Sequence, residues 1–183
     1  MNTLNLAIFA SGEGTNLQSI IDSIRLGILE CNISVIVCNK MCNAISRANN
    51  SNINTITFLW DKKKYSREKY DLELVNRMRQ YNVDLVVLAG WMHIFTNNFL
   101  KNYNNIINLH PALSNTFVGD DCIVQAFSAF NKNQINHSGV MIHRVIKDVD
   151  RGEMLNEIKV PIYNVDTFED FKNRMKRHEK GLL

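Results

Sequence analysis

Short apolar runs alternate with segments of helical periodicity along most of the chain, and this alternation constrains the fold more than any other feature. The run Leu4–Phe9 is followed by a glycine-containing loop and then by apolar residues at helical spacing, the order of a βαβ unit. The run Leu85–Leu88 is apolar without interruption, as is typical of a strand covered on both faces. This pattern predicts an α/β fold with a doubly wound, mostly parallel sheet. After Pro111 the pattern changes, and two late strands predict an antiparallel addition.

Hydrophobic spacing and capping residues set the expected bounds of the elements. Ser66 can cap a helix that runs to Tyr81, and Thr167 begins the last helix. Further helices are predicted after the first glycine loop and over 44–50, 95–103 and 123–130, and further strands over 33–37, 55–58, 106–109, 138–145 and 154–160. Apolar residues recur at helical spacing in the first helix and share one face of the third, and those of the last helix are expected to face inward. They are Leu17, Ile20, Ile21, Ile24 and Ile28; Leu74, Met78 and Tyr81; and Phe168, Phe171 and Met175.

Size and composition are those of one ordinary globular domain over residues 1–183. No apolar stretch approaches the roughly 18 residues of a membrane span, and the net charge of +3 is too small to favour nucleic acid as a partner. The N-terminus lacks the features of a signal peptide. The four cysteines (Cys31, Cys38, Cys42 and Cys122) show neither a disulfide framework nor a zinc spacing. We therefore expect free thiols, no metal, no membrane contact and a cytoplasmic location.

Three polar segments follow predicted strands and therefore lie at the edge where parallel sheets bind ligands, beyond the carboxyl ends of the strands. They are residues 11–16, 90–95 and 108–111. The first contains Gly12-Glu13-Gly14-Thr15-Asn16, where small residues and the start of a helix favour an anion. It lacks the third glycine of a dinucleotide fingerprint and the lysine of a P-loop. A phosphate site and a tight strand-to-helix turn both fit this loop.

The segment Asn108-Leu109-His110-Pro111 and the later Asp150 combine an amide, an imidazole and a carboxylate. An amide can polarise a carbonyl, an imidazole can move a proton near neutral pH, and a carboxylate can favour the charged imidazole. These are the groups needed to move an acyl group onto an amine. A structural role also fits, because acidic residues are common in polar turns for conformational reasons. For His143, on a later strand, we expect a packing or secondary role.

Five segments of the chain, in order and with similar spacing, resemble the folate-dependent phosphoribosylglycinamide formyltransferases, also called glycinamide ribonucleotide transformylases, of purine biosynthesis. The segments are residues 10–18, 66–71, 86–92, 108–113 and 148–152. The resemblance runs over nearly the whole chain and implies a Rossmann-like formyltransferase fold. It implies that 10-formyltetrahydrofolate is the co-substrate and that the amine of glycinamide ribonucleotide attacks its formyl carbon.

The same resemblance assigns roles to individual residues. Asn108 would hold and polarise the formyl oxygen, His110 would act as the acid, and Asp150 would favour its imidazolium. The resemblance also implies two groups of binding residues. Those that would bind the ribonucleotide are Gly14, Thr15, Asn16 and Glu179. Those that would bind the folate are Arg67, Met92, His93, Ile94, Phe95, Asn108, Lys147 and Asp148.

The sequence departs from the family pattern at three places. Ser114-Asn115 stands where Leu-Pro is usual, His93 stands where arginine is common, and Leu183 ends the chain soon after Glu179, a shortened C-terminus for this family. Alternatives to glycinamide ribonucleotide formylation are formyl transfer to another amine such as an amino sugar nucleotide, hydrolysis of the same donor, and non-catalytic folate or nucleotide binding. The expected partners are small molecules, and the chain is expected to be a monomer or homodimer.

Overall fold

The structure is a computed structural model in which residues 3–182 are described. It consists of two compact units, residues 1–107 and residues 108–183, with the division inside strand β5 (Ile106–His110). Among the described residues, none of the helices combines the length and the apolar composition that crossing a membrane requires. One domain over the whole chain stays a prediction.

The first unit is built on parallel strands in the order β3-β2-β1-β4. Their bounds are β1 Leu4–Ala10, β2 Cys31–Cys38, β3 Thr55–Thr57 and β4 Leu85–Leu88. Residues 7–10 of β1 are wholly buried. This burial follows from the cover that helices give to both faces of a parallel sheet, and it explains the continuous apolar runs of the sequence.

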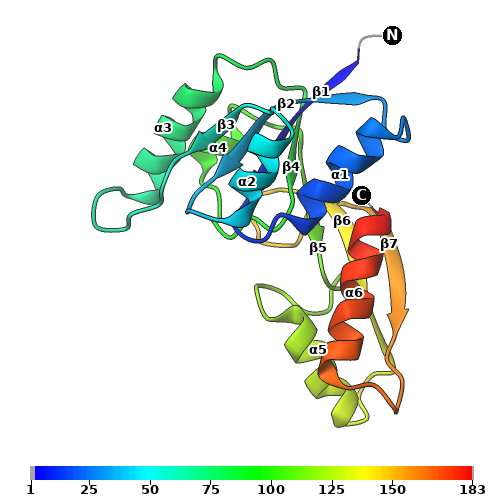
Figure 1. Cartoon of the computed structure of the whole chain (residues 1–183). Helices are drawn as coiled ribbons and strands as arrows, with labels where there is room; N and C mark the ends of the chain where they lie inside the picture. Colours follow the sequence, from blue (N-terminus) through cyan, green and yellow to red (C-terminus); the bar gives the residue numbers. More distant parts are fainter. Residues whose placement is uncertain (1–2, 183) are drawn as a thin grey trace. The chain divides into compact units, whose positions relative to one another are not determined.

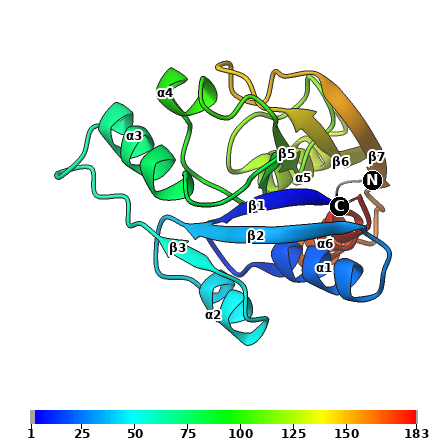
Figure 2. The same cartoon turned by 90° about the horizontal axis from the view of Figure 1, so that it is seen from above.

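Helices flank this sheet on two sides (Figure 2). Helices α1 (Thr15–Arg25) and α2 (Asn43–Asn50) lie on one side, and α3 (Arg67–Met78) and α4 (Asn97–Leu100) lie on the other. Ser66 caps α3 as predicted, since its hydroxyl accepts a hydrogen bond from the Lys69 backbone N–H at 3.3 Å. The carboxyl ends of β1, β2 and β4 all open at one edge of this sheet because the strands are parallel.

The second unit contains the end of β5, followed across the sheet by β6 (His137–Arg144) and β7 (Met154–Pro161). Strands β6 and β7 are antiparallel, as predicted for the late part of the chain. Helix α6 (Phe168–Leu182) packs against both strands and also contacts α5 (Cys122–Asn131) (Figure 1). Its N-terminus is a capping box, in which Thr167 and Asp170 exchange hydrogen bonds. The seven strands, mostly parallel with an antiparallel late pair, confirm the predicted fold class.

Two helices end earlier than predicted. Helix α1 ends at Arg25 because Gly27 adopts the left-handed conformation (φ 70°), so Ile28 lies beyond the helix and is 70% exposed. Helix α3 ends at Met78, because the Tyr81 N–H bonds the Met78 carbonyl in a tight turn. The predictions that helical structure extends to Ile28 and to Tyr81 were therefore wrong.

The helix predicted over 95–103 is also shorter, and spans only Asn97–Leu100. Thr96 is extended and caps the helix through its hydroxyl, which accepts from the Asn98 N–H at 3.3 Å. An extended residue at 96 keeps Phe95 out of the helix, although Phe95 is buried. On α6, Phe171 and Met175 are wholly buried as predicted, whereas Phe168 is only half-buried.

Candidate active site

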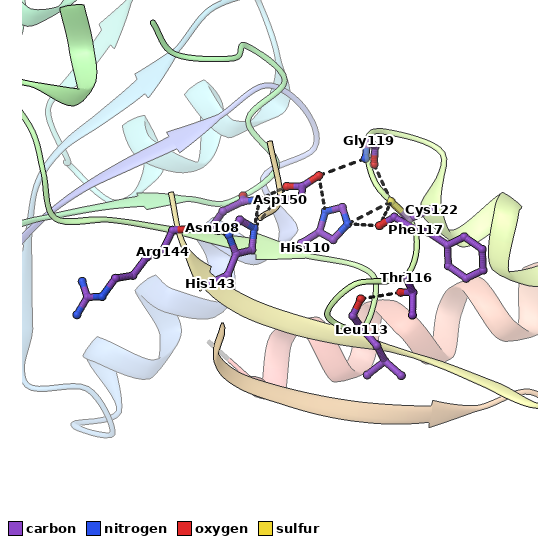
Figure 3. Close-up of polar contacts among 10 residues, drawn as sticks. All are labelled: Asn108, His110, Leu113, Thr116, Phe117, Gly119, Cys122, His143, Arg144 and Asp150. Carbon is purple, nitrogen blue, oxygen red and sulfur yellow. Dashed lines mark hydrogen bonds and ion pairs between the residues drawn. The ribbon is translucent and has the colours of Figure 1, made fainter. Parts of the chain in front are cut away.

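Asn108 and His110 lie two residues apart on β5, so the alternation of a strand places both side chains on one face. His143 lies near the end of β6, and Asp150 lies in the turn between β6 and β7. All four residues belong to the second unit. Figure 3 shows their side chains pointing toward one another around Asp150.

Asp150 is the centre of this cluster. Its Oδ2 lies 3.6 Å from His110 Nδ1 and accepts a hydrogen bond from the Gly119 N–H at 3.2 Å. Its Oδ1 lies 3.4 Å from both His143 Nε2 and Asn108 Nδ2. The two carboxylate oxygens therefore serve different partners, and the predicted trio of Asn108, His110 and Asp150 does meet in the fold (Figure 3).

The electrostatics of the cluster keep Asp150 ionised. Burial raises the pKa of this carboxyl, but the hydrogen bond from His143, the charge of His110 and the Gly119 N–H together outweigh burial and hold the pKa below its ordinary value. Asp150 is thus a carboxylate at neutral pH. The cluster therefore holds a fixed negative charge between two imidazoles.

His110 faces an acceptor with each ring nitrogen. Nδ1 faces Asp150, and Nε2 donates to the Phe117 carbonyl at 2.9 Å. The ring is 4% exposed. Both ring nitrogens of His110 therefore have a partner within the second unit.

His143 is held differently. Its Nδ1 lies 2.9 Å from the Arg144 carbonyl, which can only accept, so Nδ1 carries a proton. Its Nε2 lies 3.1 Å from Asn108 Nδ2. The same Nε2 lies 3.4 Å from Asp150 Oδ1, so it can accept from the Asn108 amide or donate to the Asp150 carboxylate. The sequence prediction gave His143 only a packing or secondary role, although its position seven residues before Asp150, at the end of the strand leading into the turn, was a usable signal.

Cys122 is a second residue that sequence reasoning left out of the site. Its Sγ lies 3.4 Å from His110 Nε2 and donates to the Gly119 carbonyl at 2.6 Å. Burial raises the pKa of the Cys122 thiol to about 11, with the charge of Asp150 adding to the effect. The protonated thiol donates its hydrogen to Gly119, and its sulfur lies beside the His110 ring. Cys31, Cys38 and Cys42 are free thiols as well.

Backbone geometry explains why the turn before β7 has its sequence. Asp150 has a left-handed backbone (φ 53°), which a non-glycine residue adopts at a cost and which is common at functional sites. At Gly152 a Cβ atom would overlap the Arg144 carbonyl, so only glycine fits. Lys147 and Asp148 are exposed in the same turn, and Arg151 reaches Asn115 in the loop after Pro111, at 3.3 Å.

The glycine loop of the first unit leads into α1. Gly14 is the N-cap residue, with φ 67°, and a Cβ there would lie 2.9 Å from Ala44 Cα on α2. Within the described chain, no side chain caps α1 and no acidic residue lies in its first turn. The positive end of the helix is therefore left without a carboxylate of its own, and Thr15 and Asn16 begin it. Both the tight turn and the anion site that the sequence allowed remain compatible with this geometry.

The segment after β4 alternates in exposure. Met92 and Ile94 are 54% and 43% exposed, whereas His93 and Phe95 are 7% and 6% exposed. The exposed pair borders a hollow of about 300 Å³ that is also lined by Arg67, the first residue of α3. The candidate folate residues of the first unit therefore share one hollow, except Phe95. Glu179 is half-buried on α6 in the second unit.

His93 is buried, although it also lines this hollow. Its Nε2 lies 2.7 Å from Asp71 Oδ1, and its ring packs among Trp60, Tyr70 and Trp91. Asp71 Oδ2 accepts from the Thr96 N–H at 2.6 Å. The side chain at 93 therefore anchors the segment to α3.

Comparisons with known proteins identify the family of the chain. The chain matches the formyl transferase family over residues 4–183. It is 40% identical to the phosphoribosylglycinamide formyltransferase of Dictyostelium discoideum, over 99% of this chain and 95% of that protein. It is 38% identical to the enzyme of that name from Schizosaccharomyces pombe, over 98% and 93%.

Comparison with solved structures also points to phosphoribosylglycinamide formyltransferases. Glycinamide ribonucleotide transformylase 1 from Geobacillus kaustophilus superposes with a TM-score of 0.91 at 30% identity, covering 99% of this chain and 95% of that one. Both the matched residues and the fold extend over the described chain. The chain belongs to the formyl transferase family, among the phosphoribosylglycinamide formyltransferases.

Proposed function

We propose that this protein transfers a formyl group from 10-formyltetrahydrofolate to the amine of glycinamide ribonucleotide in purine biosynthesis, and that it does so in the cytoplasm as a monomer or homodimer. The names of its relatives support the reaction and the substrate. The observation that carries the proposal is the buried carboxylate of Asp150 in contact with His110 and Asn108.

In the proposed reaction the amine nitrogen attacks the formyl carbon, and the carbonyl oxygen becomes an oxyanion. Asn108 donates an N–H to that oxygen, in competition with its present partners His143 and Asp150. A preorganised donor of this kind is worth roughly 10²–10³ in rate. The contact of the Asn108 amide with His143 supports this assignment.

His110 supplies the proton that the intermediate needs as the bond from the formyl carbon to the folate nitrogen breaks. The amine loses a proton, the folate nitrogen gains one, and the histidine is charged again at the end. Asp150 stays ionised and stabilises the imidazolium throughout. The backbone acceptor Phe117 holds the ring while Nδ1 faces Asp150.

The substrates are proposed to bind at the two groups of residues that the resemblance assigns. Gly14, Thr15 and Asn16 at the positive end of α1 would hold the ribonucleotide phosphate, with Glu179 at its amine end. Arg67, residues 92–95, Lys147 and Asp148 would contact the folate. No metal is required by these roles.

The experiment that tests the function is donor consumption with a panel of amines. We expect consumption of 10-formyltetrahydrofolate with glycinamide ribonucleotide and none with an amino sugar nucleotide or without amine. Consumption without any amine would identify a hydrolase, and consumption with the sugar nucleotide alone would identify another transferase. Donor binding without consumption in all arms would identify a binding module.

The roles within the cluster are tested by Asp150→Asn, which keeps the shape and removes the charge. We expect a large fall in kcat and an altered pH–rate profile, because His110 loses its charged partner. A profile identical to that of the unmodified protein would refute the pairing.

A further inference from the structure

The loop between β5 and α5, residues 111–121, supplies two backbone groups to the cluster around Asp150. The Phe117 carbonyl lies 2.9 Å from His110 Nε2, and the Gly119 N–H donates to Asp150 Oδ2 at 3.2 Å (Figure 3). Both groups belong to the backbone, so their positions follow from the conformation of the loop. The geometry of the cluster therefore depends on what holds this loop in place.

Asn115 gives the loop a backbone conformation that proline cannot adopt. Its φ is 60°, whereas the ring of a proline fixes φ at about −65°. Ser114 and Asn115 stand where Leu-Pro is usual in the family, so the loop of this chain differs from a proline-containing one. A residue without that ring has more backbone conformations open to it. Contacts from outside the loop therefore have to fix its position.

The start of the loop packs against β6. A Cβ at Gly139 would overlap the side chain of Leu113, so the glycine leaves the space that this leucine fills. Met141 and His143 lie on the same face of β6 as Gly139, because side chains alternate along a strand. The loop therefore covers the face of the sheet from which His143 contacts Asp150.

Glu157 of β7 holds the residue that follows Leu113. In the register of the two strands Glu157 lies opposite Met141, and so on the face that the loop covers. Its Oε2 accepts a hydrogen bond from the Ser114 N–H at 3.1 Å. The side chain is half-buried, and none of the ion pairs within residues 3–182 involves it. The carboxylate therefore serves the loop backbone, and hydrogen bonds to a charged acceptor are stronger than neutral ones.

Arg151 makes a second contact with the loop, from the turn that carries Asp150. Its guanidinium donates to Asn115 Oδ1 at 3.3 Å. Both side chains are exposed, so water competes for this bond and its contribution is small. Glu157, which is half-buried and bonds the backbone itself, is therefore the main external anchor of the loop.

We infer that Glu157 is a positioning residue for the proposed formyl transfer, and that it acts by fixing residues 111–121 over the cluster. This inference rests on the proposed function, because the loop matters to the rate only if His110 and Asp150 carry out the reaction. Glu157 itself bonds the loop and not the cluster. It holds the Ser114 N–H, and the loop then places its two backbone groups against the imidazole and the carboxylate.

Hydrogen exchange of single backbone amides tests the anchoring without turnover. Glu157→Ala removes the acceptor of the Ser114 N–H, whereas Glu157→Gln keeps an amide oxygen that can still accept. The informative amide is Gly119, because its own acceptor, Asp150, is unchanged in both variants. We expect its exchange to be about ten- to hundredfold faster in Glu157→Ala, as loss of a hydrogen bond to a charged group gives. Glu157→Gln should lie between that variant and the unmodified protein.

Formyl transfer to glycinamide ribonucleotide should follow the same order. We expect kcat to fall by about tenfold in Glu157→Ala with little change in KM, since a displacement of about 1 Å can lower a rate by up to about 10². Glu157→Gln should recover most of kcat. The matched control is Glu153→Ala, which removes a carboxylate just before β7 whose partner, at 3.1 Å, is the exposed Arg144. It should leave kcat and the exchange of Gly119 unchanged.

The pH–rate profile separates positioning from a loss of stability. Burial raises the pKa of Asp150, but the imidazoles and the Gly119 N–H hold it below its ordinary value. A displaced loop removes the Gly119 contribution, so the acid limb of the profile should move to higher pH in Glu157→Ala. Among the described residues, the titratable groups that face Asp150 are His110 of β5, His143 of β6 and Cys122 of α5. All three are unchanged in this variant.

The positioning role and the proposed function fail by different results. Donor consumption by the unmodified protein, together with equal kcat and equal exchange of Gly119 in Glu157→Ala and Glu153→Ala, refutes only the positioning role. A lower kcat in Glu157→Ala with an unmoved acid limb and unchanged exchange of Gly119 refutes it as well. If Glu157→Ala does not fold, Glu157→Gln decides by the same measurements. An unmodified protein that consumes no donor with glycinamide ribonucleotide refutes the function, and with it the catalytic consequence of the anchor.

Discussion

Asp71 of the first unit and Asp150 of the second are both buried carboxylates that contact histidine. Asp71 makes short bonds to His93 at 2.7 Å and to the N–H and hydroxyl of Thr96 at 2.6 and 2.7 Å. The contacts of Asp150 are longer, from 3.2 to 3.6 Å, and they include two imidazoles and an amide. The side chain of Asp71 is 0% exposed and that of Asp150 is 9% exposed.

The comparison shows how a carboxylate in contact with a histidine can either hold a segment in place or leave room for proton transfer. Asp71 lies on a regular helix, and both of its oxygens make short contacts with residues of the segment after β4. Asp150 lies on a left-handed residue in a turn, with long contacts that a substrate can tighten. Short, saturated contacts hold a segment in place, whereas longer contacts to several titratable partners leave room for proton transfer.

Loss of His110 should give the largest effect on rate. His110→Ala removes the imidazole that is proposed to act as the acid, and we expect kcat to fall by about 10²–10⁴ with little change in Tm. Single-turnover kinetics measures the fall. His137→Ala, which removes a half-buried imidazole from the start of β6, is the control and should retain the rate. A His110→Ala protein that turns over normally would refute the assigned acid.

Local sequence signals were sufficient for most of the fold. The uninterrupted run Leu85–Leu88 predicted a buried central strand, and Ser66 predicted the start of α3. The bounds that failed depend on tertiary or backbone geometry. Ile28 continues the helical spacing of α1 but follows Gly27, whose left-handed conformation ends the helix first.

The candidate site could be predicted only in part. Asn108 and His110 were accessible because they share a strand and follow its alternation, and Asp150 was proposed from its residue type, with its role assigned by the resemblance. Cys122 and the Phe117 carbonyl were not accessible, because a cysteine gives no sign of its neighbours and a backbone carbonyl gives none at all. His93 also has a buried anchoring position that only the structure reveals, since Asp71 comes from a helix far back in the sequence.

Loss of the contact between Asp71 and His93 should lower the free energy of unfolding more than it lowers kcat. Asp71→Ala leaves His93 and Thr96 without their acceptor, and we expect a loss of about 3–5 kcal/mol in the free energy of unfolding. Urea titration measures it. Glu73→Ala on the same helix breaks an exposed pair with Arg77 and should cost no more than about 1 kcal/mol. A stable Asp71→Ala protein with kcat as low as that of His110→Ala would erase the distinction between the two carboxylates.

A smaller effect is expected from the turn that carries Asp150. A Cβ at Gly152 overlaps the Arg144 carbonyl, so Gly152→Ala must displace the turn. A shift of about 1 Å is enough to lower kcat by up to about 10²-fold. Gly181→Ala is the control, because nothing lies within 4 Å of a Cβ there and alanine favours the helix by about 0.5–1 kcal/mol. Equal kcat in both variants would mean that the position of Asp150 is not critical.

The smallest effect concerns acid stability, and it bears on the charge of Asp150. The pKa of this carboxyl is lowered in the folded protein, because its hydrogen bonds and the nearby imidazoles outweigh burial. Its contribution to stability is therefore complete above the unfolded pKa of about 3.9 and is lost as the pH falls through the lower folded pKa. Asp150→Asn has no proton to gain, so its unfolding free energy should fall less steeply than that of the unmodified protein below about pH 4. Parallel curves would mean that the fold does not stabilise the carboxylate, and the longer contacts of Asp150 would then mark a weak site rather than a responsive one.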